Sequence, residues 1–585
     1  MQIFNQKQIC FSNFKHTILR SASALIISSL SVTSVSFAQE ETLEPVNPVQ
    51  QSEAQVIKST AELAPVAEIE NPALLSAIRS GKVGSVRLPD KDGILKFYQT
   101  NHGKFLWVKD AKFNSDAKKV FELIRDANTH GMNPENYYRS QLSQMIEGNF
   151  STETHAINAE LLLTASVVRY GGDISGMRVS PKAAGEDYSS WSKGVFAESL
   201  LTVLSGSSDP ENVLEMLAPQ DETYKALREE LKDTLEQYAQ DAKTRNTQIP
   251  YAGMVRPGQS GSIVPFLRKR FDLVDQDNPI YDEIVEQAVI DFQKSHGLKP
   301  DGIVGPRTIR SINEGPRDRI VKILANLERR RWIRRPMPSR FVEVNIPAMW
   351  LRAVEDNKTV FDMPVIIGRK KRETMSFVDE IVGVRFNPSW YVPSTIKKED
   401  YLPKLREDPQ ALAEKGISFR VRDENGGGMV DVLPEDIDWS QVTERDLKAI
   451  QMVQGPGAAN ALGQIRVLMP NKYDIYLHDT NAPGLFRKDD RAQSSGCVRL
   501  SEPRRIAGFI LGKNKKWSDD RLDYYLSKGK TLEIVAEQRV PVYLFYLTIW
   551  KNESGELVYG QDIYGRDEDL IKLLKNNGQI DFPMI

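Results

Sequence analysis

One cysteine and one histidine in the C-terminal half of the chain have the residue types that nucleophilic catalysis requires. Beyond residue 300, Cys497 is the only cysteine and His478 the only histidine, in a chain of 585 residues with 2 cysteines and 6 histidines. A free thiol has a pKa of about 8.5 and is only slightly ionised near neutral pH. A neighbouring imidazole supplies the missing activation by taking the proton. The pair predicts a nucleophile, Cys497, with His478 as its general acid and base.

The residues around the cysteine favour a reactive thiol over a buried, inert one. A Pro-, Gly- and Asp-rich loop joins the strand that ends at His478 to Ser494-Ser495-Gly496-Cys497, and a helix is expected to begin near Ser501. A turn of small residues leading into a helix places backbone N–H groups where they stabilise a thiolate and bind an oxyanion. The amides near Gly496 and Cys497 are therefore the candidate oxyanion hole. Tyr476 shares a strand face with His478 and either lines the substrate cleft or packs in the core.

Composition describes a soluble, multidomain protein whose first residues form a leader. The chain is 40% hydrophobic and 27% charged, with a formal net charge of -2, which gives no general attraction to nucleic acid. Residues 1–38 have three basic residues, then an uncharged stretch, then Ser36-Phe37-Ala38 as a cleavage site. This pattern predicts a cleaved signal peptide, with an uncleaved anchor as the alternative. No later run is long enough to cross a membrane.

The patterns along the chain predict a multidomain α+β protein. Its expected order is a signal peptide (1–38), a flexible spacer (39–75), a helical scaffold domain (76–253), a compact helical unit (254–315), a scaffold helix (316–338), a mainly β catalytic domain (339–540) and a C-terminal strand and helix (541–585). Strands are expected at 341–346, 350–354, 361–367, 382–386, 464–468, 473–477, 531–535 and 541–550. A polar insertion at 396–455 with Gly426-Gly427-Gly428 is expected to cap the site as a mobile lid, or else to be a remote surface excursion.

Residues 254–314 carry a recognisable pattern. Asp291-Phe-Gln-Lys-Ser-His296-Gly-Leu, Asp301-Gly302, Gly305 and Thr308 stand at spacings that resemble the three-helix peptidoglycan-binding domain of type 1. The alternative is a helical insert that holds other domains apart. His296 is expected to be a satisfied loop or cap residue. With no second histidine or cysteine near it, neither a metal nor a cofactor is expected.

The Cys–His segment resembles the catalytic signature of L,D-transpeptidases, the YkuD domain family. Ile-Tyr-Leu-His478 and Ser-Ser-Gly-Cys497-Val-Arg carry the likeness, supported by 366–374, Asn387-Pro-Ser-Trp390 and the glycine-rich 455–463. The whole arrangement is similar to the large Gram-negative periplasmic enzymes of the YcbB type, which implies a periplasmic location. Two positions depart from the family pattern. Ser495 replaces its second histidine, leaving the base to His478, and Arg499 replaces its asparagine.

This resemblance implies a two-step acyl transfer on peptidoglycan tetrapeptide stems, which serve as donor and acceptor. Cys497 attacks the third stem residue, D-Ala leaves, and a thioester is resolved by another stem to give a 3→3 crosslink. Arg499 either binds a substrate carboxylate or pairs with an acidic neighbour, and Ser495 and Tyr476 are further candidates for substrate binding. Wall-synthesis proteins are possible partners. The alternatives are a sortase-like cysteine transpeptidase and a non-catalytic peptidoglycan-binding protein.

Overall fold

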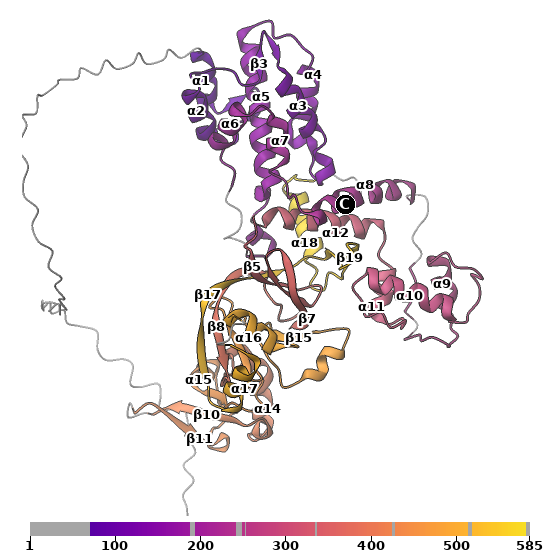
Figure 1. Ribbon diagram of the computed structural model, residues 1–585, viewed down its shortest axis with the longest axis vertical. Coiled ribbons are helices and arrows are strands. Elements are labelled where there is room, and N and C mark those ends of the chain that lie inside the picture. Colours follow the sequence, from indigo (N-terminus) through magenta and orange to yellow (C-terminus); the bar gives the residue numbers. More distant parts are fainter. Residues whose placement is uncertain are drawn as a thin grey trace, which may run out of the picture.

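The computed structural model describes residues 71–187, 194–241, 248–251, 253–333, 336–423, 427–512 and 517–580 (Figure 1). The leader expected at 1–38 and most of the spacer expected at 39–75 lie outside these residues. Among the described residues, no helix combines the length and the hydropathy that a membrane crossing requires. The fold is the expected multidomain α+β arrangement, with helical domains and a mainly β catalytic domain.

The N-terminal domain is a bundle of helices around the buried helix α5. The helices are α1 (Pro72–Ser80), α2 (Lys91–Thr100), α3 (Ser115–Arg125), α4 (Arg139–Met145), α5 (Glu153–Gly172), α6 (Ala197–Gly206), α7 (Pro210–Glu215) and α8 (Glu222–Asp241). Two short hairpins accompany them: β1 (Lys82–Val83) with β2 (Val86–Arg87), and β3 (Val108–Lys109) with β4 (Lys112–Phe113). The helices expected at 159–170 and 223–239 are confirmed within α5 and α8.

Two details of this domain differ from expectation. The spacer was expected to reach residue 75, but α1 begins at Pro72 because Leu74 and Leu75 bury in the core. Gly131 was expected to end the helix that contains Val120. That helix, α3, ends at Arg125, and Gly131 instead caps a short 3₁₀ turn at Ala127–His130 with a φ of 68°.

The compact unit at 254–315 has the three expected helices and its own apolar core. They are α9 (Val264–Arg270), α10 (Glu283–Ser295) and α11 (Pro306–Ile312). His296 caps α10, stacks on Phe292 with ring centroids 3.8 Å apart, and is hydrogen-bonded through Nδ1, as expected of a satisfied cap residue. Arg307 of α11 reaches Asp489 at 3.1 Å, which ties this unit to the loop between His478 and Cys497.

Helix α12 (Pro316–Trp332) crosses between the helical domain and the sheet domain, as Figure 1 shows. It ends at the expected residue, but most of its side chains are buried, including Glu328, Arg329 and Arg331. Its neighbours are α8 and the C-terminal helix α18 (Arg566–Asn576). The helix therefore holds three parts of the chain together.

The described residues of the catalytic domain form a nine-stranded sheet in the order β15-β7-β16-β14-β13-β8-β17-β5-β6. A further pairing of β6 with β7 closes the sheet on itself. The strands are β5 (Arg340–Asn345), β6 (Trp350–Glu355), β7 (Lys358–Gly368), β8 (Phe377–Phe386), β13 (Ile465–Leu468), β14 (Leu477–His478), β15 (Ala492–Ser494), β16 (Val498–Leu500) and β17 (Leu532–Phe545). Helices α16 (Pro503–Leu511) and α17 (Asp519–Ser527) pack beside them.

The boundary predicted at residue 540, between the catalytic domain and the C-terminal strand, is wrong. The strands expected at 531–535 and 541–550 are largely one strand, β17, which pairs with β8 on both sides of an irregularity between Val535 and Val540. Residues 536–539 bulge out of the pairing between these two positions. A short hairpin follows, β18 (Ile549–Lys551) with β19 (Leu557–Tyr559), and then α18.

The insertion at 396–455 belongs to a small folded unit with a core that includes Leu405, Phe419 and Trp439. Its sheet has the order β11-β10-β12-β9, from β9 (Trp390–Tyr391), β10 (Ile417–Arg422), β11 (Met429–Val432) and β12 (Gln451–Gln454). Its helices are α13 (Ser394–Ile396), α14 (Leu402–Glu407) and α15 (Glu444–Ala449). Gly426 lies outside the described residues. Gly427 and Gly428 lie in the β10–β11 hairpin connection, not at the base of the insertion, so the expected hinge is misplaced.

Candidate active site

Two adjacent parallel strands bring the predicted histidine and cysteine together. His478 ends β14, and β14 pairs with β16 so that His478 is the register partner of Arg499. The N–H of Val498 donates to the carbonyl of Tyr476 at 3.0 Å, so Cys497 lies beside Tyr476. Because alternate strand residues share a face, these four side chains (Tyr476, His478, Cys497 and Arg499) lie on one face of the sheet.

The helix expected near Ser501 is confirmed as α16, but the turn that carries Cys497 does not lead directly into it. Cys497 is followed by strand β16, which pairs with both β14 and β7, and α16 begins only at Pro503. The alternating apolar residues Val498 and Leu500 bury in the sheet and extend the chain before the helix can start. No helix N-terminus therefore stabilises the thiolate.

The thiol of Cys497 is half-buried, and its sulfur lies 3.7 Å from the carbonyl oxygen of Asp474. Burial raises its pKa above the ordinary value, and four smaller effects act the other way: hydrogen bonds from the backbone amide and hydroxyl of Tyr476, and the charges of Arg466 and Arg499. The resting group is a neutral thiol at neutral pH. The same four contacts are in place to stabilise negative charge as it develops on sulfur.

His478 is a buried, neutral base. Its side chain is 4% exposed, its Nδ1 has no hydrogen-bond partner among the described residues, and its ring lies 5.5 Å from that of Tyr476. Burial, and then the charge of Arg499, lower its pKa to about 3. An imidazole that stays unprotonated near neutral pH is ready to accept a proton from the thiol.

The turn before the nucleophile is fixed by hydroxyl groups. Ser494 Oγ accepts the N–H of Gly496 at 3.1 Å and donates to the carbonyl of Cys497 at 2.6 Å. Thr374 Oγ1 donates to the carbonyl of Gly496 at 2.7 Å. Gly496 has a φ of 119°, which a residue with a side chain rarely adopts. Since the Gly496 N–H is engaged by Ser494, the Cys497 amide is the better of the two predicted oxyanion donors.

Ser495 is connected to the insertion through Arg372. The guanidinium of Arg372 donates to Ser495 Oγ at 3.0 Å, to Glu399 at 2.6 Å and to Asp400 at 2.7 Å. Its side chain is only 7% exposed. The residue where the family has a second histidine thus lies in a charged network that joins the catalytic turn to the insertion. Arg372 was missed from the sequence because it comes from a distant loop.

Two arginines flank the Cys–His pair without an acidic partner. Arg466 of β13 is the register partner of His478, and its guanidinium lies over the Tyr476 ring at 4.1 Å. Arg499 lies on the other side of His478, and burial lowers its pKa. Neither forms an ion pair with any described carboxylate, and the Nε of each is buried without a hydrogen bond within the described part of the chain.

The acidic neighbour expected as one alternative for Arg499 is not found among the described residues, and its role in substrate binding stays a prediction. Arg466 was not predicted. The alternation of Ile465, Arg466 and Val467 shows that Arg466 leaves the core, but only the register of β13 with β14 places it at the site.

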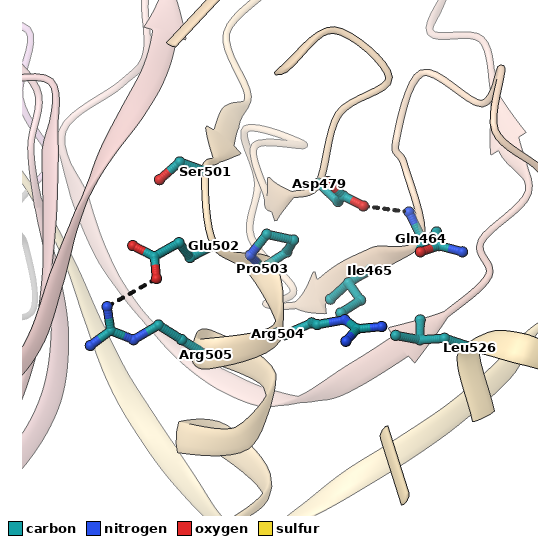
Figure 2. Close-up of a pocket in the computed structure, with 9 residues that line it drawn as sticks. All are labelled: Gln464, Ile465, Asp479, Ser501, Glu502, Pro503, Arg504, Arg505 and Leu526. Carbon is teal, nitrogen blue, oxygen red and sulfur yellow. Dashed lines mark hydrogen bonds and ion pairs between the residues drawn. The ribbon is translucent and has the colours of Figure 1, made fainter. Parts of the chain in front are cut away.

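A polar cavity of about 400 Å³ lies beyond the end of β14, as Figure 2 shows. Its acidic groups are engaged locally: Asp479 accepts the N–H of Gln464 at 2.8 Å, and Glu502 pairs with Arg505 at 3.0 Å. Neither Cys497 nor His478 lines it. The reacting groups therefore belong to the sheet face and not to this cavity. Among the described residues, no group of three or more His, Cys, Asp or Glu could hold a metal ion.

A half-buried thiol, a buried imidazole and two guanidiniums without an acidic partner among the described residues lie on this sheet face, an arrangement that suits the class of cysteine acyltransferases. Comparison with known proteins agrees with this class. Residues 339–534 match the family model of the L,D-transpeptidase catalytic domain (YkuD), residues 269–312 match that of the "Putative peptidoglycan binding domain", and residues 92–231 match that of the scaffold domain. The chain thus carries a YkuD L,D-transpeptidase catalytic domain and a peptidoglycan-binding domain.

One curated relative, from Haemophilus influenzae, is described as "Putative L,D-transpeptidase" and is 34% identical over 249 residues, which are 43% of this chain and 48% of that protein. The chain spans about half the length of this relative. Among solved structures, it is similar to the L,D-transpeptidase (residues 123–326) from Xylanimonas cellulosilytica, at 15% identity over 51% of this chain and 99% of that one, with a TM-score of 0.18. The Ldtfm-avibactam carbamoyl enzyme is 10% identical over 36% of this chain and 49% of that one, also at 0.18. Scores this low carry no argument about the fold.

Proposed function

We propose that the chain is a cysteine L,D-transpeptidase that forms 3→3 crosslinks between peptidoglycan stems. The observation that carries the proposal is the shared sheet face of Cys497, His478 and Tyr476, inside a domain that matches the L,D-transpeptidase family. The peptidoglycan-binding domain is consistent with a wall polymer as substrate. The leader pattern at 1–38 supports export and action in the periplasm.

In the first step, Cys497 Sγ attacks the carbonyl of the third residue of a donor tetrapeptide, and His478 takes the thiol proton. A C–S bond forms, the C–N bond to the terminal D-Ala breaks, and His478 returns the proton to the leaving amine. In the second step, the side-chain amine of another stem attacks the thioester. His478 takes a proton from this amine and gives it to the departing sulfur, which restores the thiol.

The charges around the pair fit this reaction. The Tyr476 hydroxyl hydrogen-bonds the sulfur and stabilises it both as attacking and as leaving group. The donor stem ends in a carboxylate and carries another on its diamino acid, and the unpaired Arg466 and Arg499 are suited to bind such groups. The Cys497 amide would donate to the oxyanion of each tetrahedral intermediate.

The direct test is incubation of the purified chain with a tetrapeptide muropeptide, with products identified by mass spectrometry. We expect a crosslinked dimer and free D-Ala, and an intermediate enzyme mass raised by the acyl group. Cys497→Ala should retain its fold, since a half-buried thiol contributes little packing, and should give neither product. Crosslinking by this variant at the ordinary rate would overturn the proposal.

The chief alternative, a wall-binding protein without catalysis, is tested by the thiol itself. Because the pKa of Cys497 is raised, the thiolate fraction should grow about tenfold per pH unit through neutral pH. The rate of alkylation by iodoacetamide should rise with the same slope. A thiol that resists alkylation up to pH 9 would support the structural role, and a rate independent of pH would indicate a preformed thiolate–imidazolium pair instead.

A further inference from the structure

The helical domain contains a second cavity, far from the catalytic strands in the sequence. It measures about 490 Å³ and lies between the β1–β2 hairpin, α4, the loop after α4 and the N-terminal half of α5. This volume is in the range of ligand-binding pockets, about 300–1,000 Å³. Neither the proposed reaction nor the scaffold match gives it a role.

The lining of this cavity carries no formal charge. None of its 13 residues is Asp, Glu, Lys or Arg, although these types make up 27% of the chain. The cavity near Asp479 differs, since two arginines and two acidic residues line it. Apart from the imidazole of His155, the lining offers no ionisable partner for phosphates, for the carboxylates of a stem peptide or for an ammonium group.

Besides the imidazole of His155, its polar side chains are carboxamides and a hydroxyl, contributed by Ser85, Gln141, Gln144, Asn149 and Asn158. Within the described part of the chain, none of these side chains makes a hydrogen bond to another residue. Each carboxamide presents a donor and an acceptor side by side. Groups of this kind match ligands whose own groups both donate and accept, as sugar hydroxyls and acetamides do.

The floor of the cavity is apolar. Val83, Phe150 and Leu162 line it while each is only 7% exposed, and Met145 lies beside them. The Phe150 ring is held by an edge-to-face contact with Phe113 at 5.2 Å. A rigid apolar floor below a rim of carboxamides suits a flat ring with C–H groups on its faces and polar groups at its edge.

We propose that this cavity binds an uncharged, N-acetylated saccharide, such as the glycan strand of peptidoglycan. The acetamide and hydroxyl groups would bond the carboxamide rim, and the ring faces and acetamide methyl would rest on the apolar floor. The site does not depend on the reaction at Cys497. It would hold the sugar backbone while the catalytic domain acts on peptides.

The Met145 methyl group provides a local probe in the intact chain. The full protein, labelled with ¹³C at its methionine methyl groups, is titrated with a chitin trimer of N-acetylglucosamine, and Met145→Leu assigns the signal. We expect a saturable shift of the Met145 signal. Cellotriose, which lacks acetamides, should shift it at least several-fold less effectively. Glycan strands stripped of their stem peptides, with the exposed lactyl carboxylates amidated to keep them uncharged, form a second arm, and tighter binding of these than of the chitin trimer would identify the wall polymer as the source.

Two charge-matched double variants provide the control. Gln144→Glu with Asn158→Asp places two carboxylates in the cavity, whereas Ser143→Asp with Thr154→Asp places two on the same helices outside it. The first should weaken saccharide binding by at least about tenfold, the loss expected when two hydrogen-bonding groups are replaced. The second should leave it within about twofold, and both should be alkylated at Cys497 at the normal rate.

The proposal is overturned if the Met145 signal does not respond to either saccharide, or if both double variants bind alike. Binding that persists without a Met145 shift would belong to the peptidoglycan-binding domain. A stronger response to a capped, uncharged peptide than to the chitin trimer would also overturn it in favour of a peptide site.

Discussion

Buried arginines serve two opposite purposes in this molecule. In the buried cluster at the C-terminal half of α12, the guanidiniums meet carboxylates: Arg178 and Arg331 share Glu328 at 2.8 and 3.0 Å, and Arg329 lies between Glu186 and Asp567. These side chains are at most 1% exposed. At the sheet face around His478, Arg466 and Arg499 have no acidic partner among the described residues.

In the α12 cluster, paired charges hold parts of the chain together. At the sheet face around His478, the cations have no such structural pairing among the described residues. In the α12 cluster, burial raises the pKa of Glu328, but the charges of Arg178 and Arg331 outweigh this effect and hold that pKa below its usual range. Opposite charges there join the helical domain, α12 and α18. At the sheet face around His478, burial and then the charge of Arg499 lower the pKa of His478, and under the proposed function Arg466 and Arg499 would bind the carboxylates of the substrate. Four predictions test this contrast.

The largest effect is expected at the base. His478→Gln should reduce the rate of Cys497 acylation by about 10²–10⁴-fold, the usual contribution of general acid–base catalysis. Because burial and Arg499 lower the His478 pKa to about 3, the wild-type rate should stay level from about pH 5 to pH 8. Single-turnover acylation followed by intact mass measures both. A fall below pH 6.5 would mean that His478 titrates normally and that the catalytic face is less cationic than the structure shows.

Next in size is the loss of a paired charge. Glu328→Gln leaves Arg178 and Arg331 buried without their carboxylate, so the free energy of unfolding should fall by about 3–5 kcal/mol. Glu122→Gln removes an exposed partner of Arg125 and should cost at most about 1 kcal/mol. Urea denaturation followed by far-UV circular dichroism compares the two. If both variants were equally stable, the α12 cluster would not have the structural role assigned to it.

The unpaired arginines should respond in the reverse way. Arg466→Met or Arg499→Met should leave the free energy of unfolding within about 1 kcal/mol, because no carboxylate loses its partner. Acylation by a tetrapeptide should fall by about 10–100-fold, mainly through KM, as expected for a lost charged hydrogen bond. The matched control is a donor whose terminal carboxylate is amidated, on which at least one of the two variants should lose little. A destabilisation as large as that of Glu328→Gln would show that these cations are structural.

The sequence predicted the candidate site residues that lie close together along the chain. Cys497, His478 and Tyr476 lie in one short segment whose strand period places them correctly. It missed Arg466 and Arg372, since their roles arise only from the pairing of β13 with β14 and from a loop far away in the chain. The buried charge cluster of α12 was also not predicted, because a run of arginines gives no sign of the carboxylates that other parts of the chain bring to it.

The predicted ends of strands were wrong for a related reason. A strand continues as long as its partners provide hydrogen bonds and its apolar side chains find a core, and neither is visible locally. Strand β17 continues past its polar residues because β8 pairs with it again from Val540. In contrast, periodicity alone predicted which domains are helical and which is mainly β, and the structure confirms this prediction.

The smallest effect concerns the link between the insertion and the catalytic turn. Arg372 pairs with two carboxylates, as Arg329 does, yet it also donates to Ser495 beside Cys497. Arg372→Gln should detach Glu399 and Asp400, so amide exchange in 396–455 should quicken several-fold, while acylation slows by only a few-fold. Hydrogen exchange read by mass spectrometry in the free and the acylated protein measures this link.

Arg420→Gln is the matched control, since its exposed partner Asp431 lies in the β10–β11 hairpin away from the turn. If the insertion is a lid, acylation should slow exchange in the wild type and in the control but much less in Arg372→Gln. If acylation changes the exchange rate in none of the three proteins, the insertion is a surface domain and not a lid. Arg372 would then only anchor the turn that contains Ser495.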